Sequence, residues 1–176
     1  MNRYRQLLEL VRDIKPKHVI EIGTWNGKRA MEMMAVSDCY YTGFDLFEEA
    51  TKETDLREFN VKPHNGMVET GKSIEVAGFS KFCLIRGDTN ETLPAYFNNG
   101  SEPFDFAFID GGHSVDTIEN DFRWISDNID DGGTIILDDW YEPELPGLGC
   151  NFIHGEVLPS TDRTSKGIVH LLKVDV

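Results

Sequence analysis

Long apolar runs are missing from this chain of 176 residues. No segment approaches the roughly 20 consecutive apolar residues that a transmembrane helix needs. The first residues lack both an uninterrupted apolar stretch and a small-residue cleavage site, so they do not resemble a signal peptide. These absences predict a protein that neither spans a membrane nor is secreted, and we expect it in the cytoplasm.

Cysteine is scarce, with one residue each at Cys39, Cys83 and Cys150. The three form no CxxC pair, which argues against a zinc site of the usual kind. Their odd number and wide spacing favour free thiols in a reducing compartment over a disulfide framework. Since two of them stand among apolar residues, we expect the thiols to be buried.

Basic residues are outnumbered: 17 lysines and arginines face 31 aspartates and glutamates, for a net charge of −14. A surface this acidic repels the phosphate backbone of nucleic acids. It also repels the anionic headgroups of a membrane surface. The charge therefore predicts that neither nucleic acid nor membrane is a partner.

What the chain does contain is an alternation of short apolar runs and amphipathic stretches. Helical spacing of apolar residues predicts helices over 3–14, 28–36 and 90–97, and another that Ser114 caps. Short apolar runs predict strands over 18–22, 40–44, 81–86, 104–109 and 134–137. For the acidic segment 46–80 we expect short helices with a mobile loop. Two last β-prone runs, 151–158 and 167–174, are expected to form an antiparallel hairpin.

This alternation predicts an α/β fold, Rossmann-like and doubly wound, in which a mostly parallel sheet carries helices on both faces. The C-terminal hairpin would close one edge. The length and an apolar content of 40% fit a single domain over residues 1–176. Ligands bind such sheets at the carboxyl ends of the strands, near the point where the strand order reverses. The polar residues of this chain gather at those ends.

The first strand ends in the turn E-I-G-T-W-N-G, with glycines at Gly23 and Gly27. A dinucleotide-binding turn needs G-x-G-x-x-G, but Trp25 and Lys28 stand where its second and third glycines belong. The acid Glu21 would also repel a pyrophosphate, whereas it suits a ligand that carries a positive charge. The turn therefore favours a nucleoside ligand over a dinucleotide.

Two further carboxylates follow the next strands. Asp45 ends the second strand, where an acid commonly accepts the hydroxyls of a ribose. Asp88, after Gly87, ends the third strand, where an adenine edge would lie. Acids at consecutive strand ends favour a bound nucleoside, although each of them alone is compatible with a tight turn or a solvated loop.

This series of motifs resembles the class I S-adenosylmethionine-dependent methyltransferases. In that family the glycine turn holds the methionine end of the cofactor, the acid after the second strand holds the ribose, and the Gly-Asp pair flanks the adenine. The resemblance implies S-adenosyl-L-methionine as cofactor. It assigns cofactor binding to Glu21, Gly23, Thr24, Gly27, Asp45, Asp88 and Asp110. Trp25 departs from the family's commoner middle glycine.

A second group of acids follows the fourth and fifth strands, in F-I-D-G-G-H and I-L-D-D-W. If these strands are neighbours, Asp110, Asp138 and Asp139 converge, and three close carboxylates must share a proton or a cation. Oxygen ligands suit Mg²⁺, Mn²⁺ or Ca²⁺ rather than zinc. The acids could equally cap a helix or lie exposed in loops, and His113 could bind a backbone carbonyl.

The pattern resembles the metal-dependent sugar O-methyltransferases of the macrocin and mycinamicin type, over about residues 18–140. The resemblance implies that Asp110, Asp138 and Asp139 hold Mg²⁺ and that Asp110 and His113 are catalytic, with His113 as the base. Some members carry an acid where this chain has Gly112, so that variant does not apply. The run F-I-D-G-G-H-S also resembles a broad, poorly assigned group of methyltransferases.

We therefore predict an S-adenosylmethionine-dependent O-methyltransferase whose acceptor is a small diol, either a sugar or a catechol-like molecule. The alternatives are a nucleotide-binding oxidoreductase of the Rossmann type and a protein that binds the cofactor without catalysis. A DNA amino-methyltransferase is disfavoured, because its N/D-P-P-Y/F motif is missing after the fourth strand. Residues 46–80 or a second subunit of a homo-oligomer would complete the acceptor site.

Overall fold

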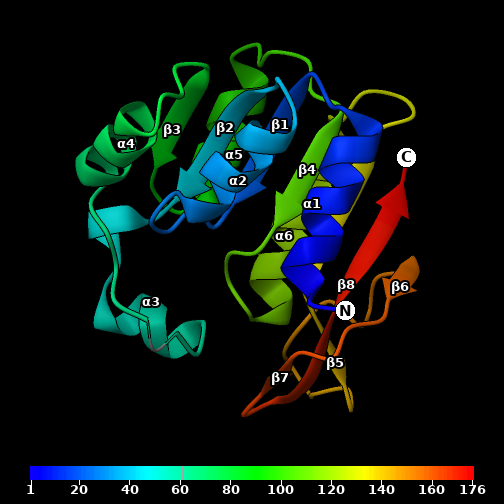
Figure 1. Ribbon diagram of the computed structural model, residues 1–176. Helices are drawn as coiled ribbons and strands as arrows, with labels where there is room; N and C mark the ends of the chain where they lie inside the picture. The colour runs from blue at the N-terminus through cyan, green and yellow to red at the C-terminus, as the bar shows by residue number, and fades with distance from the viewer. Residues whose placement is uncertain (61) are drawn as a thin grey trace.

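The computed structural model describes residues 1–60 and 62–176 of the chain. Its centre is a sheet with the strand order β3-β2-β1-β4-β5-β8-β6, in which β7 pairs with β8 (Figure 1). The strands are β1 His18–Ile22, β2 Tyr40–Asp45, β3 Phe82–Arg86, β4 Phe106–Ile109, β5 Thr134–Glu142, β6 Glu156–Leu158, β7 Arg163–Thr164 and β8 Gly167–Asp175. The first five run parallel, and β8 is antiparallel to β5 and β6. The predicted α/β class, with antiparallel strands at the C-terminus, is confirmed.

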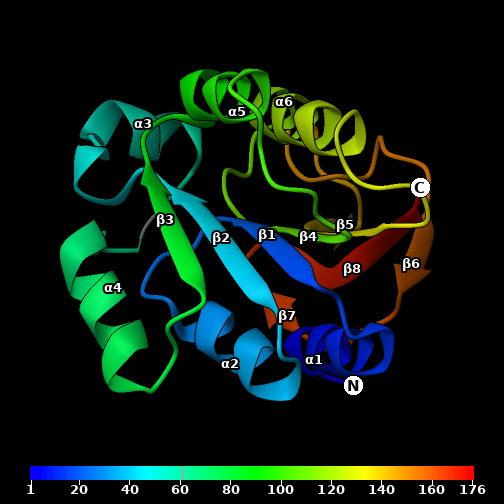
Figure 2. The ribbon, with the colours of Figure 1, turned by 90° about the horizontal axis from the view of Figure 1, so that it is seen from above.

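Helices cover both faces of this sheet. They are α1 Arg3–Ile14, α2 Lys28–Val36, α3 Lys52–Arg57, α4 Met67–Val76, α5 Thr89–Asn98 and α6 Val115–Ser126, with a short 3₁₀ helix η1 at Phe47–Glu49. Figure 2 shows α5 and α6 on one face and α1, α2 and α4 on the other. Within the described ranges, no helix is both long and apolar enough to cross a membrane.

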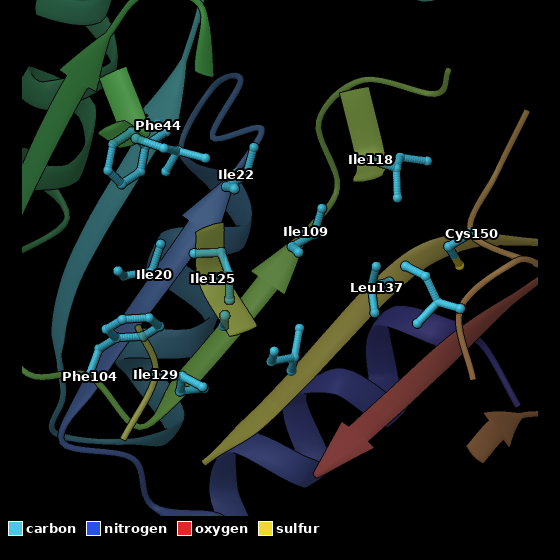
Figure 3. Packing of buried hydrophobic residues seen from close by; sticks show 14 of the residues in the cluster. Ile20, Ile22, Phe44, Phe104, Ile109, Ile118, Ile125, Ile129, Leu137 and Cys150 are labelled. Atoms are coloured by element: carbon cyan, nitrogen blue, oxygen red, sulfur yellow. The ribbon is translucent and has the colours of Figure 1, made fainter. Parts of the chain in front are cut away.

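The core is split into two layers by the sheet, because neighbouring residues of a strand point to opposite faces. Ile20 and Ile22 of β1 pack toward α5 and α6 with Phe44 and Ile125 (Figure 3). Val19 belongs to the second layer, which α1 and α2 cover. All residues of β1 and β4 are buried, as expected for central strands with helices on both faces.

The reversal of strand order lies between β1 and β4, which are parallel neighbours. The loops that leave these two strands therefore start side by side. The amide of Asp110, directly after β4, donates to the carbonyl of Ile22 at 2.8 Å. The amide of Gly23, directly after β1, donates to the carbonyl of Phe44 on β2, also at 2.8 Å. This arrangement brings together the residues that follow three strands.

Three local predictions were wrong. β5 continues past residue 137 to Glu142, because β8 pairs with it on both sides of a register shift between Leu137 and Trp140. Asp138 and Asp139 are therefore buried strand residues rather than exposed loop residues. Only Glu156–Leu158 of the run 151–158 forms a strand. Cys83 is exposed on the edge strand β3, although Cys39 and Cys150 are buried free thiols as expected.

The segment 46–80 contains η1, α3 and α4, so the expectation of short helices is confirmed for its described residues. Residue 61, which belongs to the same expectation, lies outside the described part of the chain. α3 begins with a capping box in which the Thr51 hydroxyl accepts from the Thr54 amide at 3.2 Å. It has no buried residue of its own, so side-chain contacts at its end must hold it in place.

Candidate functional site

A pocket opens at the carboxyl ends of β1, β2 and β4, at the predicted position. Its walls include Gly23 and Trp25 from the first turn, Asp45 after β2, Asp88 after β3 and His113 after β4. Residues 54–60 and 62–64 close it from outside through several side chains. Figure 1 shows α3 standing apart from the sheet, below the arrowheads of β2 and β4. We call residues 52–60 and 62–64 the cover segment.

Gly23 lets two loops pass each other at the floor of this pocket. Its backbone has φ +94°, and a Cβ added there would lie 2.1 Å from the carbonyl oxygen of Asp110. Such a distance is impossible for a side chain, so the position requires glycine. The close approach of backbone to backbone leaves the space above it to a ligand.

Asp45 is the carboxylate around which the first turn is built. Its Oδ2 accepts from the amide of Trp25 at 2.7 Å, and its Oδ1 accepts from the amide of Phe47 at 2.7 Å. Burial raises the pKa of Asp45, while these two amides oppose the rise. Two backbone donors hold the carboxylate rigidly in the pocket wall. Each oxygen keeps a lone pair for a further donor such as a hydroxyl.

Asp88 also lines the pocket, but it has a structural duty at the start of α5. Its Oδ1 accepts from the amide of Asn90 at 2.9 Å, and its Oδ2 accepts from Arg57 Nη2 at 3.2 Å. Burial raises the pKa of Asp88, but these hydrogen bonds outweigh it and leave the pKa below the usual value. Asp88 thus connects α5 to the cover segment.

The cover segment is anchored through Glu58, a residue that the sequence did not single out. Glu58 is buried, and its Oε2 accepts from the amide of Ser114 at 3.0 Å. Its Oε1 accepts from the hydroxyls of Ser114 at 3.2 Å and Thr117 at 2.6 Å. Since Ser114 caps α6, Glu58 fixes α3 to the loop after β4. A second link joins Trp25 Nε1 to the carbonyl of Pro63 at 2.9 Å.

Three of the predicted cofactor residues lie outside the described pocket walls: Glu21, Thr24 and Gly27. Glu21 points to the face of the sheet that α1 and α2 cover. There the hydroxyl of Tyr41 donates to it, and burial raises its pKa to about 8. Thr24 shares a hydrogen bond of 3.0 Å with the same hydroxyl. Gly27 has φ +74° at the start of α2. These three residues therefore contribute to the structure of the turn rather than to the pocket wall. The pocket wall includes Gly23, Asp45, Asp88 and Asp110.

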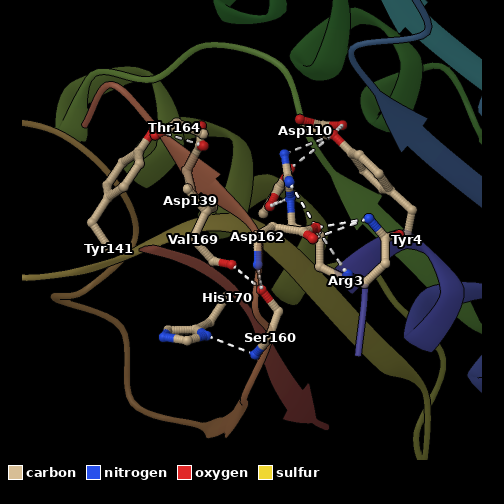
Figure 4. Close-up of polar contacts among 12 residues, drawn as sticks. Arg3, Tyr4, Asp110, Asp139, Tyr141, Ser160, Asp162, Thr164, Val169 and His170 are labelled. Carbon is tan, nitrogen blue, oxygen red and sulfur yellow. Dashed lines mark hydrogen bonds and ion pairs between the residues drawn. The ribbon is translucent and has the colours of Figure 1, made fainter. Parts of the chain in front are cut away.

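Beside the pocket, β4 and β5 bring together the predicted acids, which Figure 4 shows in part. The hydroxyl of Tyr4 lies 3.1 Å from Asp110 Oδ2 and 3.1 Å from Asp138 Oδ2. A phenol has one proton, so it donates to one of these carboxyls and accepts when the other is protonated. Burial and the charges of Asp138 and Asp139 raise the pKa of Asp110 well above its usual value. We call Asp110, Asp138 and Asp139 the acid cluster. Within it, Asp110 keeps its proton to a higher pH than an isolated aspartate does.

Asp139 turns away from the other two acids and toward His113. Its Oδ2 lies 2.5 Å from His113 Nδ1, and its Oδ1 accepts from the hydroxyl of Tyr141 at 2.7 Å. Burial raises the pKa of Asp139, but His113 and Tyr141 outweigh it and leave the pKa low. An Nδ1–H directed at a carboxylate leaves Nε2 as the acceptor of the ring. Because His113 lines the pocket, it has the arrangement of a general base held by its partner.

A divalent metal does not fit the acids in this arrangement. Both oxygens of Asp138 accept from Arg3 Nε, at 2.7 and 3.0 Å. Asp139 is engaged by His113 and Tyr141. In the described part of the chain, no group of three or more His, Cys, Asp or Glu side chains is arranged to hold a metal ion. Asp110 and Asp138 lie close to each other at the Tyr4 hydroxyl, and donors from the chain itself occupy the oxygens of Asp138 and Asp139.

A family of methyltransferase domains matches residues 20–140, which include the glycine turn, Asp45, Asp88, His113 and the acid cluster. This match covers more than half of the chain. The protein belongs to this methyltransferase family. Among curated proteins, no sequence matches the chain.

Solved structures share the fold of this methyltransferase. The O-methyltransferase TomG of Streptomyces achromogenes, in complex with SAM, is 18% identical with a TM-score of 0.61 over 77% of this chain and 54% of TomG. An O-methyltransferase of Bacillus cereus, in complex with SAH, is 22% identical with a TM-score of 0.59 over 77% of this chain and 55% of that one. This chain thus spans about half the length of both.

A third structure matches nearly the whole chain. The N-methyltransferase NodS of Bradyrhizobium japonicum is 11% identical with a TM-score of 0.68, over 98% of this chain and 93% of NodS. At these identities the likeness shows the fold alone. Since the similar structures include O- and N-methyltransferases, the acceptor atom must be argued from the site.

Proposed function

We propose that this methyltransferase uses S-adenosyl-L-methionine to methylate an oxygen of a small hydroxylated acceptor, a sugar or a catechol-like diol. The observation that carries the proposal is the hydrogen-bonded pair of His113 and Asp139 at the wall of the pocket that Gly23 and Asp45 form. A hydroxyl is a weak nucleophile that needs a base, and this pair supplies one.

The pocket suits the cofactor at two points. Gly23 lets the backbone come close to a ligand, because any Cβ there would collide with the loop after β4. Asp45 is fixed by two amides and presents oxygens to which ribose hydroxyls can donate. When bound, the cofactor supplies an electrophilic methyl group on a sulfonium. Asp88 and the cover segment, which line the same pocket, would hold the nucleoside end.

His113 carries the proton transfer in this proposal. Its Nε2 would take the proton of the acceptor hydroxyl and so make the oxygen a better nucleophile. Asp139 keeps the proton on Nδ1 and stabilises the imidazolium that forms, and Tyr141 holds Asp139 in place. Asp110 lies at the pocket wall beside this pair. No step of the mechanism uses a metal ion, because the contacts of Asp138 and Asp139 do not fit one. The magnesium site stays a prediction of the sequence.

The other expectations also stay predictions: the cytoplasmic location, the lack of nucleic-acid and membrane partners, the diol acceptor and the homo-oligomer. An oxidoreductase is disfavoured by the glycine spacing of the first turn, in which Trp25 and Lys28 replace two glycines. A cofactor-binding protein without catalysis would keep the pocket but would have no need of a paired histidine in its wall.

Calorimetric titration with S-adenosylhomocysteine, with NADH as the control ligand, tests the proposal. We expect micromolar binding of the methyl-cofactor product and none of NADH. The acceptor is then found by transfer of a labelled methyl group from the cofactor to a panel of sugars, catechols and amines. Failure of a folded protein to bind the product would overturn the proposal, and transfer to amines alone would overturn the choice of oxygen.

A further inference from the structure

The start of α1 lies against the acid cluster and brings a cation to it. Arg3 Nε donates to both oxygens of Asp138, and Arg3 Nη1 donates to Asp162 Oδ2 at 3.1 Å. The third nitrogen, Nη2, donates to the hydroxyl of Tyr4 at 3.1 Å. The side chains of Arg3 and Asp138 are 15% and 2% exposed. This ion pair is thus shielded from water and is stronger than a surface pair.

Two further contacts fix the guanidinium in position. Asn2, the N-cap of α1, donates to both oxygens of Asp162 at 3.1 and 2.9 Å, so the helix start is docked on the loop before β7. The guanidinium groups of Arg3 and Arg29 both lie over the ring of Tyr4, 4.4 and 3.8 Å from its centroid. Arg3 therefore reaches Asp138 in one preorganised conformation.

Each acid of the cluster also has a hydrogen-bond partner from the chain itself. Asp138 is met by Arg3, Asp139 by His113, and Asp110 by the hydroxyl of Tyr4. A Mg²⁺ or Ca²⁺ ion would sit 2.0–2.6 Å from its carboxylate oxygens. Arg3 Nε already lies 2.7 and 3.0 Å from the two oxygens of Asp138. An ion at Asp138 would therefore have to displace the guanidinium or bear its repulsion.

We propose that Arg3 is the resident cation of the acid cluster, in the place that the acid pattern alone would give to a divalent metal. It is a positioning residue: it acts through Asp138 and, by way of Tyr4, through Asp110 at the pocket wall. The N-terminal helix is thereby part of the site. The consequence for methyl transfer, that turnover needs no metal, rests on the proposed function, whereas the consequence for metal binding does not.

Titration with Mn²⁺, followed by the electron paramagnetic resonance of the free ion, tests this without cofactor or acceptor. The wild-type protein is expected to show no saturable site up to millimolar Mn²⁺. Arg3→Met should create one site and tighten binding by more than about tenfold, because it removes a full charge at ion-pair distance. Arg3→Met combined with Asp138→Asn should lose that site again. Arg3→Lys should behave as the wild type.

The matched control is Arg5→Met, on the same helix but exposed and paired with Glu9 away from the acid cluster; it should not alter Mn²⁺ binding. A single saturable wild-type site, abolished by Asp138→Asn, would overturn the proposal. A folded Arg3→Met variant that gains no site would also overturn it. If circular dichroism shows that Arg3→Met does not fold, Arg3→Gln, which keeps a neutral polar side chain, takes its place: gain of a site supports the proposal, and a folded variant without one overturns it.

A parallel titration with S-adenosylhomocysteine separates this inference from the proposed function. If the wild-type protein does not bind S-adenosylhomocysteine, the proposed function is wrong, but the Mn²⁺ result is unaffected. Binding of the product together with a wild-type Mn²⁺ site would instead keep the function and remove the role of Arg3.

Discussion

The carboxylates that follow β2 and β3 differ from those within β5. Asp45 and Asp88 line the pocket, whereas Asp138 and Asp139 are buried and hydrogen-bonded to other side chains. Asp45 is held by backbone amides, which fix its position without adding a positive charge. Asp138 is met by the guanidinium of Arg3, and Asp139 by the ring of His113. Asp45, which is held by uncharged amides, keeps lone pairs for a ligand, whereas Asp138 and Asp139 hold the side chains of Arg3 and His113 in place.

Asp110 lies where the two halves meet. It lines the pocket and also lies at hydrogen-bond distance from Tyr4, which links it to Asp138. The reversal of strand order between β1 and β4 puts it there, because it brings the loops after these strands together. Under the proposed function, binding is assigned to the half formed by β1, β2 and β3, and proton transfer to the half formed by β4 and β5.

The strongest test of the proton-transfer half is His113→Gln. Glutamine keeps a polar side chain of similar reach but cannot take a proton, so turnover should fall by about 10²–10⁴-fold. Binding of S-adenosylhomocysteine should stay close to the wild-type value. Single-turnover transfer of a labelled methyl group measures the first effect and calorimetry the second. A variant that keeps wild-type turnover would show that His113 is not the base.

Asp45→Asn tests the binding half. The amide keeps the shape of the carboxylate but loses its charge, which should weaken binding of S-adenosylhomocysteine by roughly 10–100-fold, or about 1.5–3 kcal/mol. Asp38→Asn is the matched control, because Asp38 is exposed and paired with Lys81 away from the pocket. Calorimetry on both variants, with circular dichroism to confirm folding, measures the difference. Equal affinities would contradict a ligand at Asp45.

Glu58→Gln tests whether the cover segment belongs to the binding half. Glutamine cannot accept from the Ser114 amide and two hydroxyls as well as a carboxylate does, so the segment should detach more often. We expect about a tenfold loss of affinity for S-adenosylhomocysteine, on the order of 1.4 kcal/mol. Proteolysis within the segment should also be faster. Glu53→Gln, an exposed change on the same helix, should show neither effect.

The sequence predicted the central strands and most helices, because short apolar runs alternate with stretches of helical spacing along the chain. It placed the end of β5 too early, since Asp138-Asp139 resembles a loop until β8 pairs with it. The proximity of Asp110 and Asp138, which share the Tyr4 hydroxyl, needs only that β4 and β5 are parallel neighbours. Asp139 is instead engaged by His113 and Tyr141.

What the sequence could not give is the partner of each acid. Arg3 and Glu58 meet their partners across 135 and 56 positions of the chain, and no local pattern marks such pairs. Glu21 is a related case. Strand alternation places it, like Val19, on the face that α1 and α2 cover, but its motif predicted cofactor binding instead. Contacts that depend on packing between distant elements are fixed only by the tertiary structure.

The smallest effect concerns Asp121 of α6, a pocket-lining acid that lacks the partners of the acid cluster. It is buried, and its Oδ2 accepts no hydrogen bond from the described part of the chain. Burial raises its pKa from 3.8 to about 7. Between these values the folded protein holds a proton that the unfolded chain releases, so stability falls as pH rises through this range.

Asp121→Asn should remove this dependence. The variant should gain on the order of 1 kcal/mol over the wild type at pH 8, and roughly 2–4 °C in melting temperature, but nothing at pH 4. Asp127→Asn is the control, because Asp127 is exposed at the end of the same helix. Thermal melts of the three proteins across this pH range measure the difference. If the gain were equal at both pH values, the burial of a charge on Asp121 would not be its cause, and the contrast between this acid and those of the acid cluster would not hold.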